Sequence, residues 1–168
     1  MYPILVNTDS VSQPLRAEFQ QLKARMMGHP FLKGLRIDHL STLSIYAMQT
    51  EFTPGQLVLK QGDIANRFYL IQEGKVALQA HNAEGTLDIQ TVGPGDVLGW
   101  SWLFWPYTWR FDARALEPVK AIFFYGTRLR EHCEEDPLFG YELMKRVAQV
   151  AIERLQIVRQ LLLHRPVT

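Results

Sequence analysis

The sequence predicts an α+β fold in which an antiparallel β-sandwich or barrel lies between helical segments at both ends of the chain. Apolar residues recur at helical spacing before residue 50 and again after residue 125. The stretch 50–125 between them contains short β-type runs, and it holds seven of the eleven glycines of the chain. Many short strands separated by turn residues are typical of a sandwich or barrel.

Composition and length narrow the class of protein. The 168 residues predict one domain spanning 1–168, and 47% hydrophobic residues exclude a mainly disordered chain. With a net charge of +1, the chain lacks the excess of Lys and Arg that is typical of a dedicated nucleic-acid-binding protein. The one cysteine excludes a disulfide scaffold and predicts a cytoplasmic protein. We expect no membrane span, because no apolar run reaches about 18 residues, and no signal peptide, because the short apolar start lacks a basic leader.

Residues 12–48 are predicted to form N-terminal helices. Pro14 suits the first turn of the first helix. One apolar stripe follows at spacings of four and three: Leu15, Phe19, Leu22 and Met26. His29-Pro30 ends this helix, because a residue before proline avoids helical dihedrals. A shorter helix is expected over 36–47, with inward side chains from Leu40, Leu43 and Tyr46.

Residues 50–125 are predicted to form the β region. The candidate strands are 57–60, 67–72, 76–81, 87–91, 111–116 and 119–125. The unbroken apolar run Phe68–Ile71 suits a buried strand. Gly62 and Gly74 occupy positions where the chain must turn.

Residues 126–165 are predicted to form C-terminal helices. A short helix covers 126–134, and Asp136 with Pro137 then begins a long helix that ends before Pro166. Along the long helix an apolar seam alternates spacings of four and three, which is typical of a helix that packs along another helix. The seam comprises Met144, Ala148, Ala151, Leu155, Val158 and Leu162. We therefore expect a homodimer through this helix.

Two segments resemble the signatures of a known family. Residues 58–74, VLKQGDIANRFYLIQEG, closely resemble the first signature of the cyclic nucleotide-binding domain, and residues 92–99, VGPGDVLG, resemble its turn into a phosphate-binding cassette. The resemblance covers about 31–163. It implies an antiparallel β jelly roll (double-stranded β-helix) flanked by N-terminal helices and a long C-terminal helix. It also implies a regulatory sensor whose ligand is a cyclic nucleotide.

The cassette departs from the family pattern. In the family, a glutamate directly after the cassette glycine accepts the ribose hydroxyl, and an arginine at the far end binds the phosphate. Trp100 follows Gly99 here, and tryptophan cannot accept a hydroxyl proton. The arginine position falls on Arg110 when counted forward from Gly99, and on Trp109 when counted back from the strand 111–115.

Strand alternation favours Trp109. Phe111, Ala113 and Ala115 form the apolar, inward set, whereas Asp112 and Arg114 are expected to face outward. Trp109 is in phase with the inward set. Arg110 remains the alternative, through an adjustment of the loop.

All four tryptophans lie between positions 100 and 109, which leaves two interpretations open. They form an aromatic pocket that stacks a cyclic nucleotide or another small heterocycle, or they plug the barrel mouth, Trp102 and Phe104 above all. Ser101 donates to a ligand or caps the short helix expected after Gly99. The candidate ligand-binding residues are Gly99, Trp100, Ser101, Trp102, Leu103, Trp109 and Arg110.

No catalytic or metal-binding pattern accompanies the cassette. The five histidines form no metal-binding motif, so neither a metal site nor a cupin-type enzyme is expected. Cys133 is interpreted as a half-buried cysteine without a role. The basic residues of the last helix are predicted to form a solvated face.

The sequence therefore predicts a ligand-responsive, non-enzymatic regulator. The alternative is a ligand-free adaptor that binds a protein partner and whose pocket is plugged by aromatic residues. A jelly-roll enzyme is the third hypothesis, for which the sequence offers no catalytic residues. DNA binding is not expected, because the chain ends at Thr168, where the DNA-binding domain of the family's transcription factors would begin.

Overall fold

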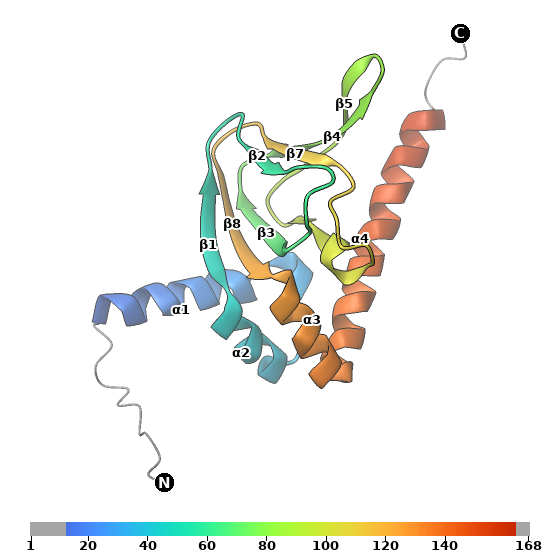
Figure 1. The fold of residues 1–168 in the computed structure, drawn as a ribbon. Coiled ribbons are helices and arrows are strands. Elements are labelled where there is room, and N and C mark those ends of the chain that lie inside the picture. Colours follow the sequence, from blue (N-terminus) through green and yellow to red (C-terminus); the bar gives the residue numbers. More distant parts are fainter. Residues whose placement is uncertain (1–12, 164–168) are drawn as a thin grey trace.

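Two antiparallel sheets of four strands form the centre of the molecule in the computed structural model, which describes residues 13–163 (Figure 1). The first sheet has the order β1 (Met48–Phe52), β8 (Val119–Tyr125), β3 (Arg67–Glu73) and β6 (Val97–Leu98). The second has the order β2 (Leu57–Leu59), β7 (Asp112–Ala115), β4 (Val76–Asn82) and β5 (Gly85–Val92). The predicted jelly roll is confirmed.

Helices lie at one end of the roll and along its side (Figure 1). The N-terminal helical elements are α1 (Gln13–Met27), η2 (Pro30–Leu32) and α2 (Ile37–Tyr46). The 3-10 helix η3 (Trp100–Leu103) connects β6 to β7, and α3 (Gly126–Glu135) and α4 (Pro137–Leu163) follow β8. The predicted boundaries at residues 12, 165 and 166 lie outside the described residues.

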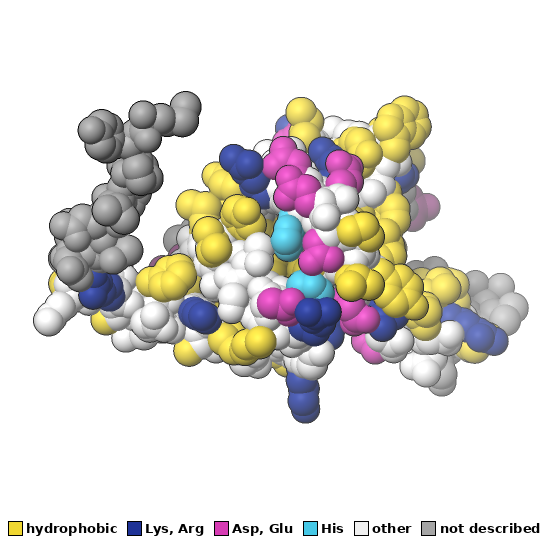
Figure 2. Space-filling model, turned by 90° about the horizontal axis from the view of Figure 1, so that it is seen from below, with side chains coloured by type: hydrophobic (Ala, Val, Ile, Leu, Met, Phe, Trp, Pro, Cys, Tyr) yellow, Lys and Arg dark blue, Asp and Glu magenta, His cyan; other side chains and the backbone are white. Residues whose placement is uncertain are grey.

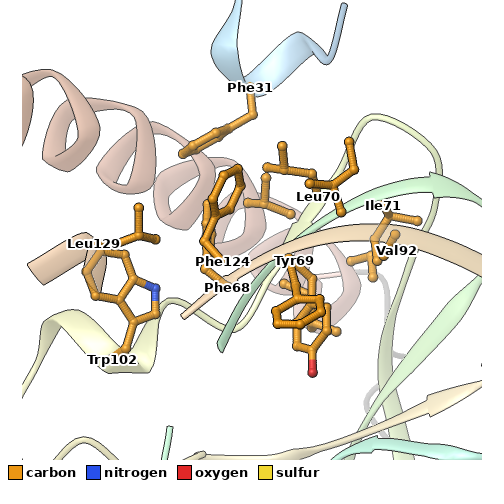
Figure 3. Packing of buried hydrophobic residues seen from close by; sticks show 14 of the residues in the cluster. Phe31, Phe68, Tyr69, Leu70, Ile71, Val92, Trp102, Phe124 and Leu129 are labelled. Atoms are coloured by element: carbon orange, nitrogen blue, oxygen red, sulfur yellow. The ribbon is translucent and has the colours of Figure 1, made fainter. Parts of the chain in front are cut away.

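The core is centred on β3, as the apolar run predicted. Phe68, Tyr69, Leu70 and Ile71 are all buried. Phe68 is paired with Phe124 in the register of β3 and β8. Figure 3 shows these side chains beneath Phe31 of η2, whose ring meets that of Phe68 edge-on at 5.3 Å. The N-terminal helical segment is thereby packed onto the sheet.

Two strands were not predicted. Only Phe52 of β1 is buried, so this edge strand shows no apolar alternation, and it is defined by its pairing with β8. β6 has only two residues, Val97 and Leu98. Neither segment carries a local pattern long enough to be recognised.

Most of α1 lies away from the sheets (Figure 1). Met26 is buried, but Leu15 and Phe19 at the far end of the same stripe are exposed. The stripe therefore contacts the core only through its C-terminal part.

The long helix α4 begins as predicted. The Asp136 carboxylate accepts the N–H groups of Leu138 and Phe139, each at 3.1 Å. The inner face of α4 buries Phe139, Leu143 and Val147. The predicted seam lies elsewhere on the helix. Its exposed members are Met144, Ala148, Ala151, Leu155 and Leu162, and Val158 is half-buried.

The α3–α4 junction is held by histidines. His39 of α2 places Nε2 3.1 Å from Asp136 Oδ2, and the rings of His39 and His132 both pack on Phe139. Figure 2 shows histidine side chains next to acidic ones on the face seen from below. Burial raises the pKa of the nearby Cys133 thiol to about 11, so this cysteine is unreactive at neutral pH.

Candidate functional site

The cassette begins at Gly99, where the backbone must turn sharply from β6 into η3. Gly99 has a φ of 85°, in the left-handed region. A Cβ here would lie 2.9 Å from the Arg67 carbonyl oxygen and 3.0 Å from Cη2 of Trp109. Both constraints require glycine. The expected short helix after Gly99 is present, but Ser101 does not cap it: the cap residue is Gly99, without a side-chain hydrogen bond.

Trp102 is a core residue. It is 0% exposed, and its ring meets Phe68 edge-on at 6.1 Å. Figure 3 shows it directed toward Leu129 of α3. A Cβ added at Gly126 would lie 2.5 Å from Trp102 Cβ, so α3 begins in close contact with the cassette. For Trp102, burial supports the interpretation as a plug.

Trp109 also faces inward. It is 6% exposed, whereas Arg110 is exposed. The orientation expected from strand alternation is therefore confirmed for Trp109. Its ring lies against Gly99, so an indole fills the space beside the start of η3.

Alternation misplaced the neighbouring Asp112. This residue was expected to face solvent, but it is buried. Its Oδ1 accepts the backbone N–H of Gln61 at 2.7 Å, and its Oδ2 lies 2.7 Å from His81 Nε2 on β4. The carboxylate is covered because a turn and a neighbouring strand both bond to it.

The aromatic loop after η3 is largely outside the core. Trp105 is 80% exposed and Phe104 is also exposed, so the expectation that Phe104 plugs the barrel is wrong. Ile64, whose backbone forms a bridge with Thr108 of this loop, is exposed as well. The loop and the segment bridged to it thus expose three large apolar side chains. Leu103, another candidate, is half-buried and packs against the core.

Trp100 contacts a residue that the sequence analysis assigned to a solvated face. The Arg154 guanidinium of α4 lies 4.4 Å from the centroid of the Trp100 ring. One of its nitrogens, Nη2, donates to the Val97 carbonyl of β6. The other, Nη1, is buried without a hydrogen-bond partner among the described residues. Burial lowers the pKa of Arg154 to about 10, although Asp96 acts to raise it, so Arg154 is charged at neutral pH.

The spacing of α4 contained the signal for Arg154. Val147 and Val150 belong to the inner face, and Arg154 continues their spacing of three and four. A basic residue on an inward stripe is a candidate ligand contact. The solvated-face expectation treated all basic residues of the helix alike, and it is wrong for Arg154.

A cavity of about 500 Å³ lies between α4 and the β5–β6 turn, beside Arg154. We refer to it as the α4 groove. Its lining includes Phe31, Gln90, Val97, Val150 and Arg154. This volume lies within the usual range for small-molecule pockets, about 300–1,000 Å³.

The cassette contacts α3 as well as α4. Arg130 of α3 donates from Nη1 to the Trp102 carbonyl oxygen at 3.0 Å, and its guanidinium lies 4.4 Å from the Tyr107 ring centroid. The residues of the cassette that contact Arg130 or Arg154 are Trp100, Trp102 and Tyr107. Side chains of both C-terminal helices therefore contact the cassette.

Residues 13–163 contain no cluster of three or more His, Cys, Asp or Glu side chains placed to hold a metal ion. Within the same range, no helix is both long and apolar enough to cross a membrane.

The comparisons with known proteins agree with this geometry. The model of the family described as "Cyclic nucleotide-binding domain" matches residues 49–136, just over half of the chain. A CRP-like cAMP-activated global transcriptional regulator from Mycobacterium tuberculosis is 24% identical over 118 residues, which is 70% of this chain and 53% of the regulator. The chain thus spans about half the length of this curated relative.

Two solved structures share the fold. A putative cyclic nucleotide-binding protein from Geobacter metallireducens matches with a TM-score of 0.69 and 29% identity, over 81% of this chain and 96% of that protein. The regulatory subunit of a cAMP-independent protein kinase A from Trypanosoma brucei matches with a TM-score of 0.67 and 20% identity, over 88% and 54% of the two chains.

Proposed function

The chain belongs to the cyclic nucleotide-binding domain family, and from this premise we propose that it is a regulatory sensor module. A small ligand binds at the cassette and changes the position of α4, which transmits the change to a partner. The module acts as a homodimer through the exposed seam of α4, and its role is regulatory, not enzymatic. The ligand is a nucleotide or another small heterocycle.

One observation carries this proposal: the cassette contacts both C-terminal helices. Arg154 of α4 lies on Trp100, and Arg130 of α3 is bonded to the Trp102 carbonyl. A ligand shifts an equilibrium only through its different affinity for the two states. A ligand that inserts beside Trp100 must displace or engage Arg154, and it therefore distinguishes between two positions of α4.

The atypical cassette argues for contacts different from those of cyclic-nucleotide binders. Trp100 cannot accept a ribose hydroxyl, and Trp109 fills the space next to Gly99. The Trypanosoma brucei protein, described as the regulatory subunit of a cAMP-independent kinase, shares this fold. We therefore treat cyclic AMP as one candidate among several heterocyclic ligands.

Tryptophan fluorescence tests the proposal. The purified protein is titrated with cyclic AMP, cyclic GMP and cyclic dinucleotides. All four tryptophans lie between positions 100 and 109, so the signal reports on the cassette alone. A saturable change supports a nucleotide sensor. No change with any of these ligands, from a protein shown to be folded, contradicts the nucleotide ligand.

The ligand-free adaptor is the second candidate, and a specific observation favours it. Trp102 and Trp109 are buried inside the roll, while Phe104, Trp105 and Ile64 are exposed beside it. Exposed aromatic residues are enriched where proteins bind each other. Trp105→Ser would weaken binding of a protein partner and leave the dissociation constants of small ligands unchanged, although it removes one of the four fluorescent tryptophans.

A further inference from the structure

The α4 groove contains a guanidinium group, that of Arg154, which forms no ion pair with a carboxylate among the described residues. The acidic groups lining it are Asp96, Glu142 and Glu153. Each has a near partner: the Gly93 N–H at 2.8 Å, Lys145 Nζ at 2.7 Å and Gln149 Nε2 at 2.8 Å, respectively.

Two guanidinium groups of α4 also line the groove, and they are held differently. Arg146 donates to the carbonyl oxygens of Phe31 and Lys33, at 2.7 and 2.9 Å, and thereby fastens α4 to the segment around η2. Within residues 13–163, the hydrogen bond of Arg154 goes to the Val97 carbonyl oxygen. Among the described residues, neither forms an ion pair with a carboxylate.

Nη1 of Arg154 is buried and has no hydrogen-bond acceptor among the described residues. A buried donor without a partner is costly, and the cost is larger for a charged group. The guanidinium is also fixed in place, because it stacks on Trp100 and bonds to Val97. A fixed, charged, unsatisfied donor beside a cavity is prepared to bind an oxyanion.

We propose that the α4 groove binds the oxyanion group of a small ligand through Arg154, at the place where α4 meets the cassette. This inference rests on the proposed sensor function and specifies how that sensor anchors its ligand. The shared chemistry is a singly charged oxyanion, either a phosphodiester or a carboxylate.

The surrounding charges favour a single negative charge. Asp96 lies close enough to raise the pKa of Arg154, and Glu153 is the next residue along the helix. These two acids repel an incoming anion, and they repel a dianion more strongly than a monoanion. A phosphomonoester carries up to two charges at neutral pH because its second pKa is about 6. Cyclic AMP, a monoanion, should therefore bind better than 5′-AMP.

In the family pattern stated above, an arginine of the cassette supplies the charge. Trp109, at the inward position of the cassette, supplies packing. Arg154, on the helix, supplies the charge. The anion would then contact α4 directly, so binding and the position of α4 would depend on the same side chain.

The test compares Arg154→Gln with Arg159→Gln. Arg159 is an exposed arginine on the same helix, so the two variants lose the same charge. The probes are cyclic AMP, uncharged adenosine, dimethyl phosphate and acetate, all at constant ionic strength and followed by tryptophan fluorescence. We expect Arg154→Gln to raise the dissociation constant of the anionic probes at least about tenfold, because a charge-assisted hydrogen bond is lost. Arg159→Gln should bind the anionic probes with the same dissociation constants as the wild type. Adenosine should bind Arg154→Gln as well as it binds the wild type.

The outcomes separate this inference from the proposed function. If the wild type responds to dimethyl phosphate or acetate but to no nucleotide, and Arg154→Gln abolishes that response, the anion site stands and the nucleotide ligand is rejected. If cyclic AMP binds wild type and Arg154→Gln equally, the sensor stands and the Arg154 site is overturned. The absence of any saturable response from folded wild type also overturns the site.

A purely structural role for Arg154 gives a different result. If Arg154 only ties α4 to the cassette, its replacement lowers the melting temperature and leaves the anion response unchanged. Should Arg154→Gln not fold, Arg154→Lys keeps the charge but loses the fork of donors. Arg154→Lys should bind dimethyl phosphate several-fold more weakly than the wild type does. Binding equal to that of the wild type would contradict the proposal.

Discussion

At the scale of the residue, Gly99 determines how the cassette starts. Its φ of 85° and its contacts with Arg67 and Trp109 both exclude a side chain. We expect Gly99→Ala to lower the free energy of unfolding by about 1–2 kcal/mol for the left-handed backbone and by about 1–3 kcal/mol more for the close contacts. Urea denaturation measures this loss.

Gly55 provides the matched control for that variant. Its φ is 83°, but nothing lies within 4 Å of an added Cβ. Gly55→Ala should therefore show the backbone cost alone, and the difference between the two variants measures the close contacts of Gly99 with the Arg67 carbonyl and the Trp109 ring. Equal losses in both variants would show that these contacts do not require glycine at position 99.

Strand alternation predicted the orientation of a side chain correctly where the alternation was regular. It failed where residues from another strand or turn covered an outward-facing side chain. Trp109 faces inward as its phase predicted. Asp112 has the outward phase, yet His81 and the Gln61 N–H cover it. Arg154 was missed because its role depends on Trp100 and Val97, which are more than fifty positions away in the chain. The spacing of α4 places Arg154 on the inward stripe, but it does not reveal which distant residues this side chain contacts.

At the scale of the element, Asp112 ties β7 to β4 and to the turn at Gln61. Burial acts to raise the pKa of the Asp112 carboxyl, but the hydrogen bonds from Gln61 and His81 and the nearby Arg114 outweigh it and hold that pKa below its usual value. Because the folded pKa is lower than the unfolded one, about 3.9, the carboxylate stabilises the fold above that pH. This contribution is lost as the pH falls through the folded pKa.

Asp112→Asn tests this tie. At pH 7 the variant should be less stable by about 1–3 kcal/mol, since hydrogen bonds to a charged group are lost. The difference from the wild type should begin to shrink below about pH 4, where the unfolded carboxyl takes up a proton, and it should be lost as the pH falls through the lower pKa of the folded wild type. Chemical denaturation at several pH values provides the measurement, and a difference that stays constant down to pH 2 would contradict the assignment.

The elements that the sequence predicted best are those with long internal patterns. The run in β3 and the capped start of α4 both correspond to observed elements. β1 and β6 were not predicted, because an edge strand and a two-residue strand owe their existence to pairing with β8 and β3. Pairing partners distant in the chain are not visible in a local window.

At the scale of the whole molecule, α4 has one face that packs on the rest of the chain and another that carries an exposed apolar seam. Its inner face packs Phe139, Leu143 and Val147 on the body of the protein and brings Arg154 to the cassette. The seam predicted from the sequence lies outside that contact, and Leu155 is 65% exposed. An apolar seam at heptad spacing that the chain itself leaves uncovered is suited to a second copy of the same helix.

Leu155→Glu tests the dimer. A charge in the seam would have to be buried without a partner, so we expect the dimer dissociation constant to rise at least about tenfold. Sedimentation velocity over a range of concentrations measures this shift. Gln156→Glu is the control, because it adds the same charge at the next exposed residue, which is outside the seam. If Leu155→Glu and the wild type sediment as the same species at every concentration, the seam does not form the dimer. A weakened dimer that still binds its ligand would show that ligand binding does not require the second copy.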